Sequence, residues 1–284
     1  DGVVLLGLGS VVLESASEAS PDDVDGANHT ISITTSNVAH PPKSVALCNL
    51  TITNSHQGKA CVHIQGDNGG EIGLVDSSLD ANGKPEVTFG HGGVWITDCR
   101  LMARQETTYQ VYAALMNNLY VSGGSFEGSH SSSLIRVEET AKFVLQGVGA
   151  VKGVQVDYDG AGANFPATLG SSYLIQDCSS VGAVDSELVD AGSLTISGCP
   201  SVGNVSFDGN RELTVISSVI GDLDTDSSAS LINSTRGAIS GTGTLSEPHL
   251  RGTLTFTATD SESLVFGLEQ PDAKIGRASC RERV

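Results

Sequence analysis

The chain has 284 residues, and 39% of them are hydrophobic, which is enough apolar side chain for a sizeable core and excludes a disordered chain. Its 15 basic and 33 acidic side chains give a formal net charge of −18, which repels nucleic acid and anionic membranes. Short Val, Ile and Leu runs alternate with Gly, Asn, Asp and Ser clusters, so the composition predicts an all-β protein with many turns.

Residues 1–29 are predicted to hold strands and a loop. An apolar run extends from Val3 to Leu13, and Gly7 and Gly9 interrupt it as they would in paired strands. No basic leading segment of a secretory signal is visible before this run. We therefore expect this segment to contain strands of a chain truncated at its start.

One eight-residue pattern returns through the middle of the chain. Its copies begin at Val45, Ile72, Val94, Leu119, Phe143, Tyr173, Leu194 and Leu213. The first and last of these starts are seven steps apart, so one repeat averages roughly 24 residues. Such a period predicts a solenoid, in which each repeat forms one coil.

Each position of the pattern has a physical interpretation. The first and third residues are apolar in nearly every copy, as in a strand with one buried face. The fifth residue is of a type that mostly tolerates a left-handed backbone, which predicts a sharp corner there. These corner residues are Asn49, Asp76, Asp98, Gly123, Gly147, Asp177, Gly198 and Ser217. A second short strand is expected after the corner, and a third at Val62, Val87, Val111 and Ile135.

The predicted fold is a right-handed, single-stranded parallel β-helix with three-strand coils of about 24 residues. We expect the helix to occupy residues 30–244, and residues 245–273 to be a last coil or the start of a further segment. The last ten residues, Ile275 to Val284, resemble a translated sequencing adapter, so residues 274–284 are expected to be an artefact.

With these repeats, residues 30 to 240 resemble the pectin-lyase-like superfamily of right-handed parallel β-helices. That superfamily includes polysaccharide lyases and hydrolases, phage tailspikes and surface adhesins. The resemblance is specific for the fold and carries little information on function.

No complete lyase, hydrolase or esterase signature is present. Gly90, His91 and Gly92 resemble the Gly-His-Gly turn of pectin hydrolases, but the carboxylate motifs that should precede it in register are missing. The weak catalytic candidates are Asp67, His91, Glu138 and Glu139. Asp157 and Asp159 resemble the start of a calcium loop that lacks two ligands, so neither a metal nor a cofactor is expected.

The cysteines are predicted to be buried free thiols. Cys99, Cys178 and Cys199 all occupy the sixth repeat position, in one internal column with Ser77 and Ser218. Cys178 and Cys199 lie on adjacent coils, so a disulfide between them would depend on the geometry.

Two outward-facing stripes are candidate binding surfaces. His63, Thr88, Tyr112 and Arg136 occupy matching outward positions, and the equivalent face of carbohydrate-active relatives forms their binding groove. An ordinary solvated strand face would look the same. Trp95, Tyr120, Val144 and Leu174 form an apolar second stripe, for which a covering loop or another subunit, as in a homotrimer, is favoured over sugar stacking.

The leading hypothesis is a glycan-facing β-helix of an extracellular, virion-surface or cell-surface protein, adhesin-like or tailspike-like. The alternatives are a polysaccharide lyase or glycoside hydrolase, and a purely structural solenoid. Polysaccharide is the expected partner. No nucleic acid partner and no membrane span within this chain are expected.

Overall fold

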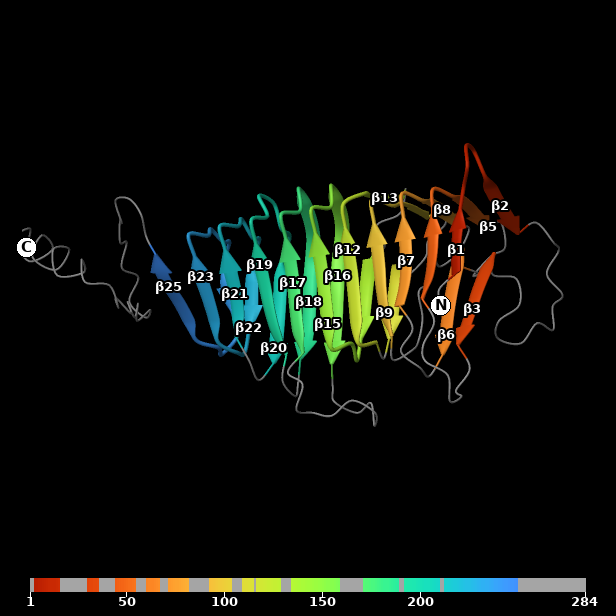
Figure 1. Ribbon diagram of the computed structural model, residues 1–284. Coiled ribbons are helices and arrows are strands. Elements are labelled where there is room, and N and C mark those ends of the chain that lie inside the picture. Colours follow the sequence, from red (N-terminus) through yellow and green to blue (C-terminus); the bar gives the residue numbers. More distant parts are fainter. Residues whose placement is uncertain are drawn as a thin grey trace, which may run out of the picture.

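The computed structural model describes residues 3–15, 30–35, 44–54, 60–66, 71–81, 92–103, 109–114, 116–128, 134–158, 171–188, 192–209 and 212–249. These residues form strands and turns, and the strands stack side by side in long parallel sheets (Figure 1). Within these ranges there is no helix of the length and apolarity that crossing a membrane requires. The prediction of an all-β repeat fold is confirmed.

Sheet 1 contains the predicted repeat. Its 11 strands follow in spatial order β1 (Val3–Leu6), β4 (Val45–Cys48), β7 (Glu71–Val75), β9 (Gly93–Thr97), β12 (Asn118–Ser122), β15 (Lys142–Gln146), β17 (Ser172–Gln176), β19 (Ser193–Ser197), β21 (Leu213–Ile216), β23 (Ala229–Ile232) and β25 (Leu245–His249). The first residue of each of the eight predicted copies is the register partner of the first residue of the next copy. The first and third residues of the pattern point inward, since Leu119 and Val121 are buried.

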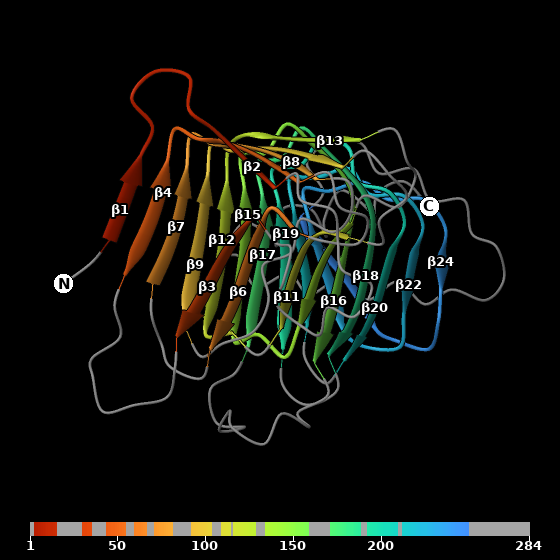
Figure 2. The same ribbon diagram turned by 90° about the vertical axis from the view of Figure 1, so that its right-hand side faces the viewer.

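Two further sheets complete the stack, and Figure 2 shows them beside and above sheet 1. Sheet 2 contains β2 (Val12–Ser15), β5 (Thr51–Asn54), β8 (Ser78–Ala81), β10 (Arg100–Ala103) and β13 (Ser125–Gly128). Sheet 3 contains β11 (Tyr109–Ala114), β14 (Leu134–Glu138), β16 (Ala150–Tyr158), β18 (Ser180–Leu188), β20 (Val205–Gly209), β22 (Leu223–Thr225) and β24 (Ile239–Ser240). Strands β3 (Ile31–Thr35) and β6 (Val62–Gly66) form a separate pair.

The corner after each sheet 1 strand has the predicted left-handed backbone. All eight residues at the fifth position have positive φ, from 48° at Ser217 to 67° at Gly198. Asn233, with φ 51°, makes the same corner after β23, a copy that the repeat pattern missed because it begins with Ala229. The left-handed corner is therefore the most regular feature of the coil.

The sixth position forms the predicted internal column. Ser77, Cys99, Cys178, Cys199 and Ser218 are buried, and each donates to the carbonyl oxygen two residues earlier at 2.8 to 3.4 Å. Ser218 Oγ also accepts the backbone N–H of Cys199, one coil away, at 3.1 Å. The three cysteines are free thiols, as expected.

The prediction of three strands in every coil is wrong for the second half of the chain. From β15 onward all named strands belong to sheets 1 and 3, and the second and third strands merge into the nine-residue strands β16 and β18. In the coils after β18 the second strand is reduced to isolated parallel bridges, such as Val202 with Ile220. The last coils are also shorter than predicted, because Leu213 pairs with Ala229 and Ala229 with Leu245, a sequence separation of 16 each time. A column of glycines follows the second half of the stack: Gly182, Gly203, Gly221 and Gly237 lie where an added Cβ would come within 3.0 Å of neighbouring atoms.

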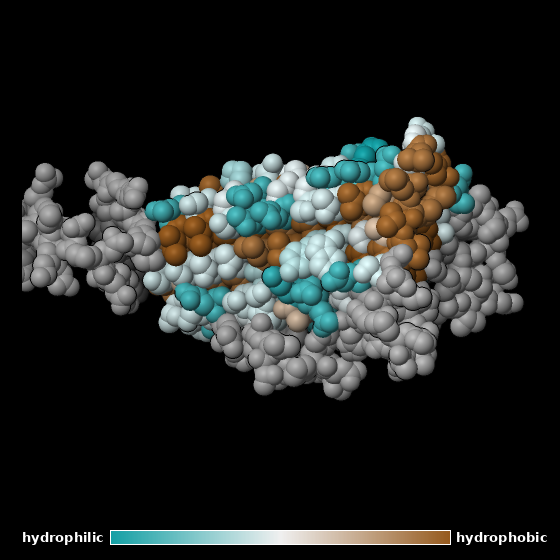
Figure 3. All heavy atoms as spheres, viewed as in Figure 1, coloured by the Kyte–Doolittle hydropathy of each residue, from teal (hydrophilic) through white to brown (hydrophobic). Residues whose placement is uncertain are grey.

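The outermost coil leaves apolar side chains uncovered among the described residues. Leu5 on β1 is 44% exposed, whereas Leu47, its partner on β4, is 3% exposed. Figure 3 shows this end of sheet 1 as a broad hydrophobic surface.

Candidate functional site

A β-bulge in β11 places two tyrosines on the outer face of sheet 3. Tyr109 is in register with Leu134 and Val111 with Ile135, so Gln110 is an extra residue with no partner on β14. In a regular strand, residues three apart face opposite sides of the sheet. The bulge cancels this alternation, and the rings of Tyr109 and Tyr112 stack with centroids 5.9 Å apart and planes at 27°.

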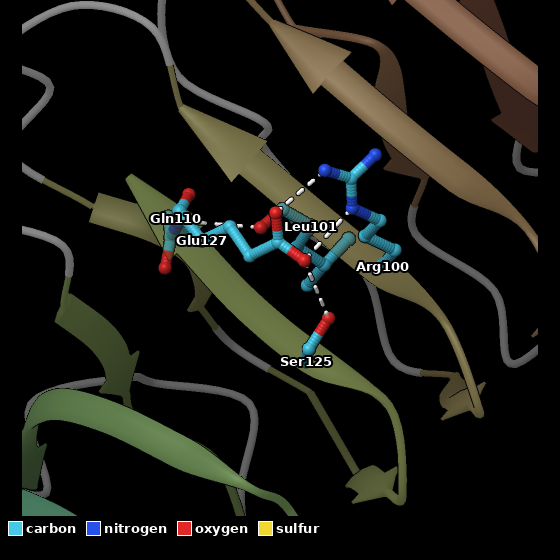
Figure 4. Close-up of polar contacts among 5 residues, drawn as sticks. All are labelled: Arg100, Leu101, Gln110, Ser125 and Glu127. Carbon is cyan, nitrogen blue, oxygen red and sulfur yellow. Dashed lines mark hydrogen bonds and ion pairs between the residues drawn. The ribbon is translucent and has the colours of Figure 1, made fainter. Parts of the chain in front are cut away.

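Gln110 turns inward and holds the bulge in place (Figure 4). Its side chain is fully buried, and Nε2 donates to the carbonyl oxygens of Glu127 at 2.7 Å and Leu101 at 3.4 Å. These carbonyls lie on two successive sheet 2 strands, β10 and β13. The side chain of Glu127 is fixed separately on the outer face by Arg100, with contacts of 2.8 and 2.6 Å. The amide of Gln110 therefore links the bulge in β11 to the backbone of both sheet 2 strands.

Arg136 organises the charged part of this face. It is the register partner of Tyr112, and its guanidinium lies 5.1 Å from the ring centroid of Tyr109, to whose hydroxyl it also hydrogen-bonds. It forms ion pairs with Glu138 at 2.5 Å and Asp157 at 3.2 Å. The hydroxyl of Tyr112 donates to Glu138 at 2.6 Å. We call Tyr109, Tyr112, Arg136, Glu138 and Asp157 the tyrosine face.

The pKa values of Asp157 and Arg136 are both raised on the tyrosine face. Burial raises the pKa of Asp157, and the neighbouring carboxylates of Glu138, Asp185 and Glu187 raise it further, against the opposing effect of Arg136. For Arg136, burial acts to lower the pKa, but its hydrogen bond to Tyr109 and the nearby carboxylates outweigh burial and raise it. The guanidinium therefore stays charged, while Asp157 takes up a proton more readily than a free carboxyl.

A ladder of carboxylates continues from the tyrosine face along sheet 3. Glu138, Asp157, Glu187 and Asp208 are register partners on four successive strands. Adjacent strands are about 4.8 Å apart, so the carboxylates form a row of hydrogen-bond acceptors roughly 14 Å long.

The structure brings together only some of the predicted site residues. Tyr112, Arg136 and Glu138 lie on the tyrosine face, and Glu139 follows β14 with a left-handed backbone at φ 44°. His63 lies on β6, which pairs with β3 and has no described pairing to β11. Asp67, Thr88 and His91 lie outside the described residues, so their predicted roles stay predictions.

Sequence reasoning missed Tyr109 and gave Asp157 a different role. Simple alternation assigns Tyr109 to the face opposite Tyr112, and the bulge at Gln110 has no local sequence signal. Asp157 was noted only for its resemblance to the start of a calcium loop that lacks two ligands, with a long surface turn as the preferred interpretation, and the structure places it within β16. Among the described residues, no three His, Cys, Asp or Glu side chains are arranged to hold a metal ion.

The second predicted stripe lies on the outer face of sheet 1. Trp95, Tyr120, Val144 and Leu174 are register partners on β9, β12, β15 and β17. The rings of Trp95 and Tyr120 are parallel within 6°, with centroids 5.5 Å apart, and Lys142 Nζ lies 5.2 Å from the Tyr120 ring centroid. The expected role of this stripe in subunit or loop packing stays a prediction.

Comparisons of this chain with models of known families, with curated proteins and with solved structures find no match.

Proposed function

We propose that this chain is a right-handed, single-stranded parallel β-helix of the pectin-lyase-like type, and that it binds polysaccharide through the outer face of sheet 3. The successive return of the chain to the same sheets supports the fold. The observation that carries the function is the bulge at Gln110, which presents the stacked Tyr109 and Tyr112 beside Arg136 and Glu138. Bulges that re-aim side chains in this way are frequent at functional sites.

The chemistry of the tyrosine face suits a sugar chain. Aromatic rings pack against the apolar C–H faces of sugar rings, while carboxylate and guanidinium groups hydrogen-bond to sugar hydroxyls. Arg136 and Glu138 are half-buried and fix each other's orientation, so little side-chain entropy is lost when a ligand binds. The carboxylate ladder beyond them would accept hydroxyl groups from further sugar units.

A glycan array probed with the labelled protein tests this function. The double variant Tyr109→Ala and Tyr112→Ala removes both aromatic surfaces, and we expect retention of the bound glycans to fall at least tenfold. Ser206→Ala is the matched control, because Ser206 lies in the Tyr112 column of sheet 3 but outside the tyrosine face. Undiminished retention by the double variant would reject this face as the binding site.

A surface, adhesin-like or tailspike-like protein of the extracellular space is the biological setting that we propose for this binding, with a homotrimer as its assembly. Sedimentation velocity measures the assembly directly, and a monomer at micromolar concentration contradicts it. The absence of both glycan binding and turnover would favour a purely structural solenoid.

Hydrolysis of a glycosidic bond is a second candidate function, and the raised pKa of Asp157 beside Glu138 favours it. Glu138 and Asp157 are register partners on adjacent strands about 4.8 Å apart, a spacing that suits a retaining hydrolase. Asp157 would protonate the leaving oxygen while Glu138 attacks the anomeric carbon, and Asp157 would then take a proton from the water that releases the sugar from Glu138. Reducing-sugar release from a polysaccharide panel measures this reaction, and ultraviolet absorbance of unsaturated products detects a lyase instead. Asp157→Asn should abolish hydrolysis while leaving glycan retention in place.

A further inference from the structure

Two cysteines of the internal column lie next to each other on adjacent coils. The strands that precede them, β17 and β19, are paired in register, and Cys178 and Cys199 each come two residues after the end of their strand. Both side chains are buried, with exposed fractions of 1% and 0%, and both thiols are free. The column therefore places one thiol directly above another.

The two thiols have the same conformation, one coil apart. Each Sγ lies 3.4 Å from the carbonyl oxygen two residues earlier in its own coil. Each also approaches a carbonyl oxygen of the preceding coil, at 3.9 Å from Leu145 for Cys178 and at 4.0 Å from Ile175 for Cys199. Leu145 and Ile175 are themselves register partners. One sulfur is therefore related to the other by the step between coils, which is about 4.8 Å.

A step of this length is too long for a disulfide and close to the sulfur separation of a linear metal site. A disulfide joins sulfurs about 2.05 Å apart, so both side chains would have to leave their present conformation. A metal–thiolate bond is about 2.3 Å long, and two such bonds in line separate the sulfurs by roughly 4.6 Å. A metal ion between the two sulfurs therefore requires only a small adjustment of the side chains.

The contact between the two thiols favours loss of a proton from one of them. Hydrogen bonding to Cys178 lowers the pKa of the Cys199 thiol to about 7, although burial opposes this shift. Metal binding goes further, because both sulfurs must be deprotonated to act as ligands. With a monovalent cation the buried product carries a single negative charge, half that of two bare thiolates.

We propose that Cys178 and Cys199 form a two-coordinate site for Cu⁺, a soft cation that thiolates favour and that accepts linear coordination. Two S–H bonds are replaced by two S–Cu bonds, and both protons pass to the solvent. Zn²⁺ does not suit the pair, since structural zinc takes four ligands and no third His, Cys, Asp or Glu joins these two among the described residues. No metal was predicted from the sequence, because its calcium loop lacks two ligands, but a linear site needs only two. The site lies in the interior and is independent of the polysaccharide binding proposed for sheet 3.

The test loads the reduced full chain with Cu⁺, supplied as its acetonitrile complex under nitrogen during refolding from urea, and then adds the chelator bathocuproine disulfonate. We expect the wild type to retain one Cu⁺ per chain, and X-ray absorption at the copper edge to show two sulfur neighbours. Cys178→Ser and Cys199→Ser should each weaken retention by roughly a hundredfold or more. Both variants should fold, because serine already occupies this column at Ser77 and Ser218 with the same carbonyl contact.

Cys99→Ser is the matched control. Cys99 lies in the same column, with Sγ 3.3 Å from the carbonyl oxygen of Thr97, but its neighbours on the adjacent coils are Ser77 and Gly124. This variant should retain Cu⁺ as the wild type does. Wild-type retention by a folded Cys178→Ser chain overturns the site, as does a wild type that yields all its copper to the chelator. Three sulfur neighbours of the copper, or a disulfide between the two proposed ligands in protein alkylated at lysis, overturn it as well.

Discussion

Gly182→Ala adds a single methyl group, and the structure predicts that this group destabilises the fold. An added Cβ at Gly182 would lie 1.6 Å from the carbonyl oxygen of Lys152 and 2.4 Å from its carbonyl carbon. Ordinary contacts of this kind begin at 3.4 Å, so the Lys152 carbonyl must move by nearly 2 Å. The φ of Gly182 is not positive, so the penalty comes from packing alone.

The movement also disturbs the next coil. Gly203 N–H donates to the carbonyl oxygens of Val181 and Gly182 at 2.9 and 3.1 Å, and both acceptors lie on β18, the strand that the clash pushes away from Lys152 on β16. Overpacking costs about 1–3 kcal/mol, and a weakened backbone hydrogen bond adds about 1 kcal/mol. The expected loss is therefore roughly 2–4 kcal/mol, or about 10 °C in Tm for a chain of this size.

Thermal unfolding followed by far-ultraviolet circular dichroism measures this loss. Gly73→Ala is the matched control, since the same methyl group enters open space there and should raise stability by about 0.5–1 kcal/mol. Equal Tm values for Gly182→Ala and the wild type would refute the close approach of β16 and β18.

Three further predictions concern interior groups and charge. Ser218→Ala leaves the buried N–H of Cys199 without its acceptor and should cost about 1–3 kcal/mol in urea unfolding, whereas the exposed Ser228→Ala should change stability by less than about 0.5 kcal/mol. Burial raises the pKa of Cys99 from 9.0 to about 11, so its stabilising effect is complete below pH 9.0 and is lost as the pH rises toward 11. Cys99 should resist iodoacetamide at pH 8 in the native protein, and rapid alkylation detected by mass spectrometry would contradict its burial. The pKa of Asp157 is raised above 3.8, so ionisation of this group destabilises the fold at neutral pH. Asp157→Asn should raise Tm at pH 7 but not near pH 3, and a lower Tm at pH 7 would mean that the ion pair with Arg136 dominates.

The repeat could be read from the sequence because each of its features is local. The alternation of Leu119 and Val121 with polar neighbours needs only the period of a strand, and the corner at Asp98 or Gly123 needs only a residue that tolerates positive φ. The internal column follows from these two, since Cys99 comes immediately after a corner. Register between coils then aligns equivalent positions, which is why Trp95 and Tyr120 were placed side by side correctly.

The coil length could not be predicted in the same way. The last coils shorten to a sequence separation of 16, and their copy of the pattern begins with Ala229, which an apolar-start template passes over. Whether Gly182 and Gly203 are flexible turn residues or points of close backbone approach depends on the neighbouring coil. That neighbour is distant in sequence, so no local pattern contains the information.

The candidate sites, too, were predicted from the sequence only in part. The amino-acid sequence determined the coil, the corners, the buried column and the membership of Tyr112 and Arg136 in one outward stripe. The tertiary structure alone decided that Gln110 bulges inward and turns Tyr109 to the same face, and that the ring of Trp95 lies over Gly93. The physical reason is that a strand's own alternation sets which residues face outward in the absence of bulges, whereas bulges and empty spaces arise from the strands packed on either side.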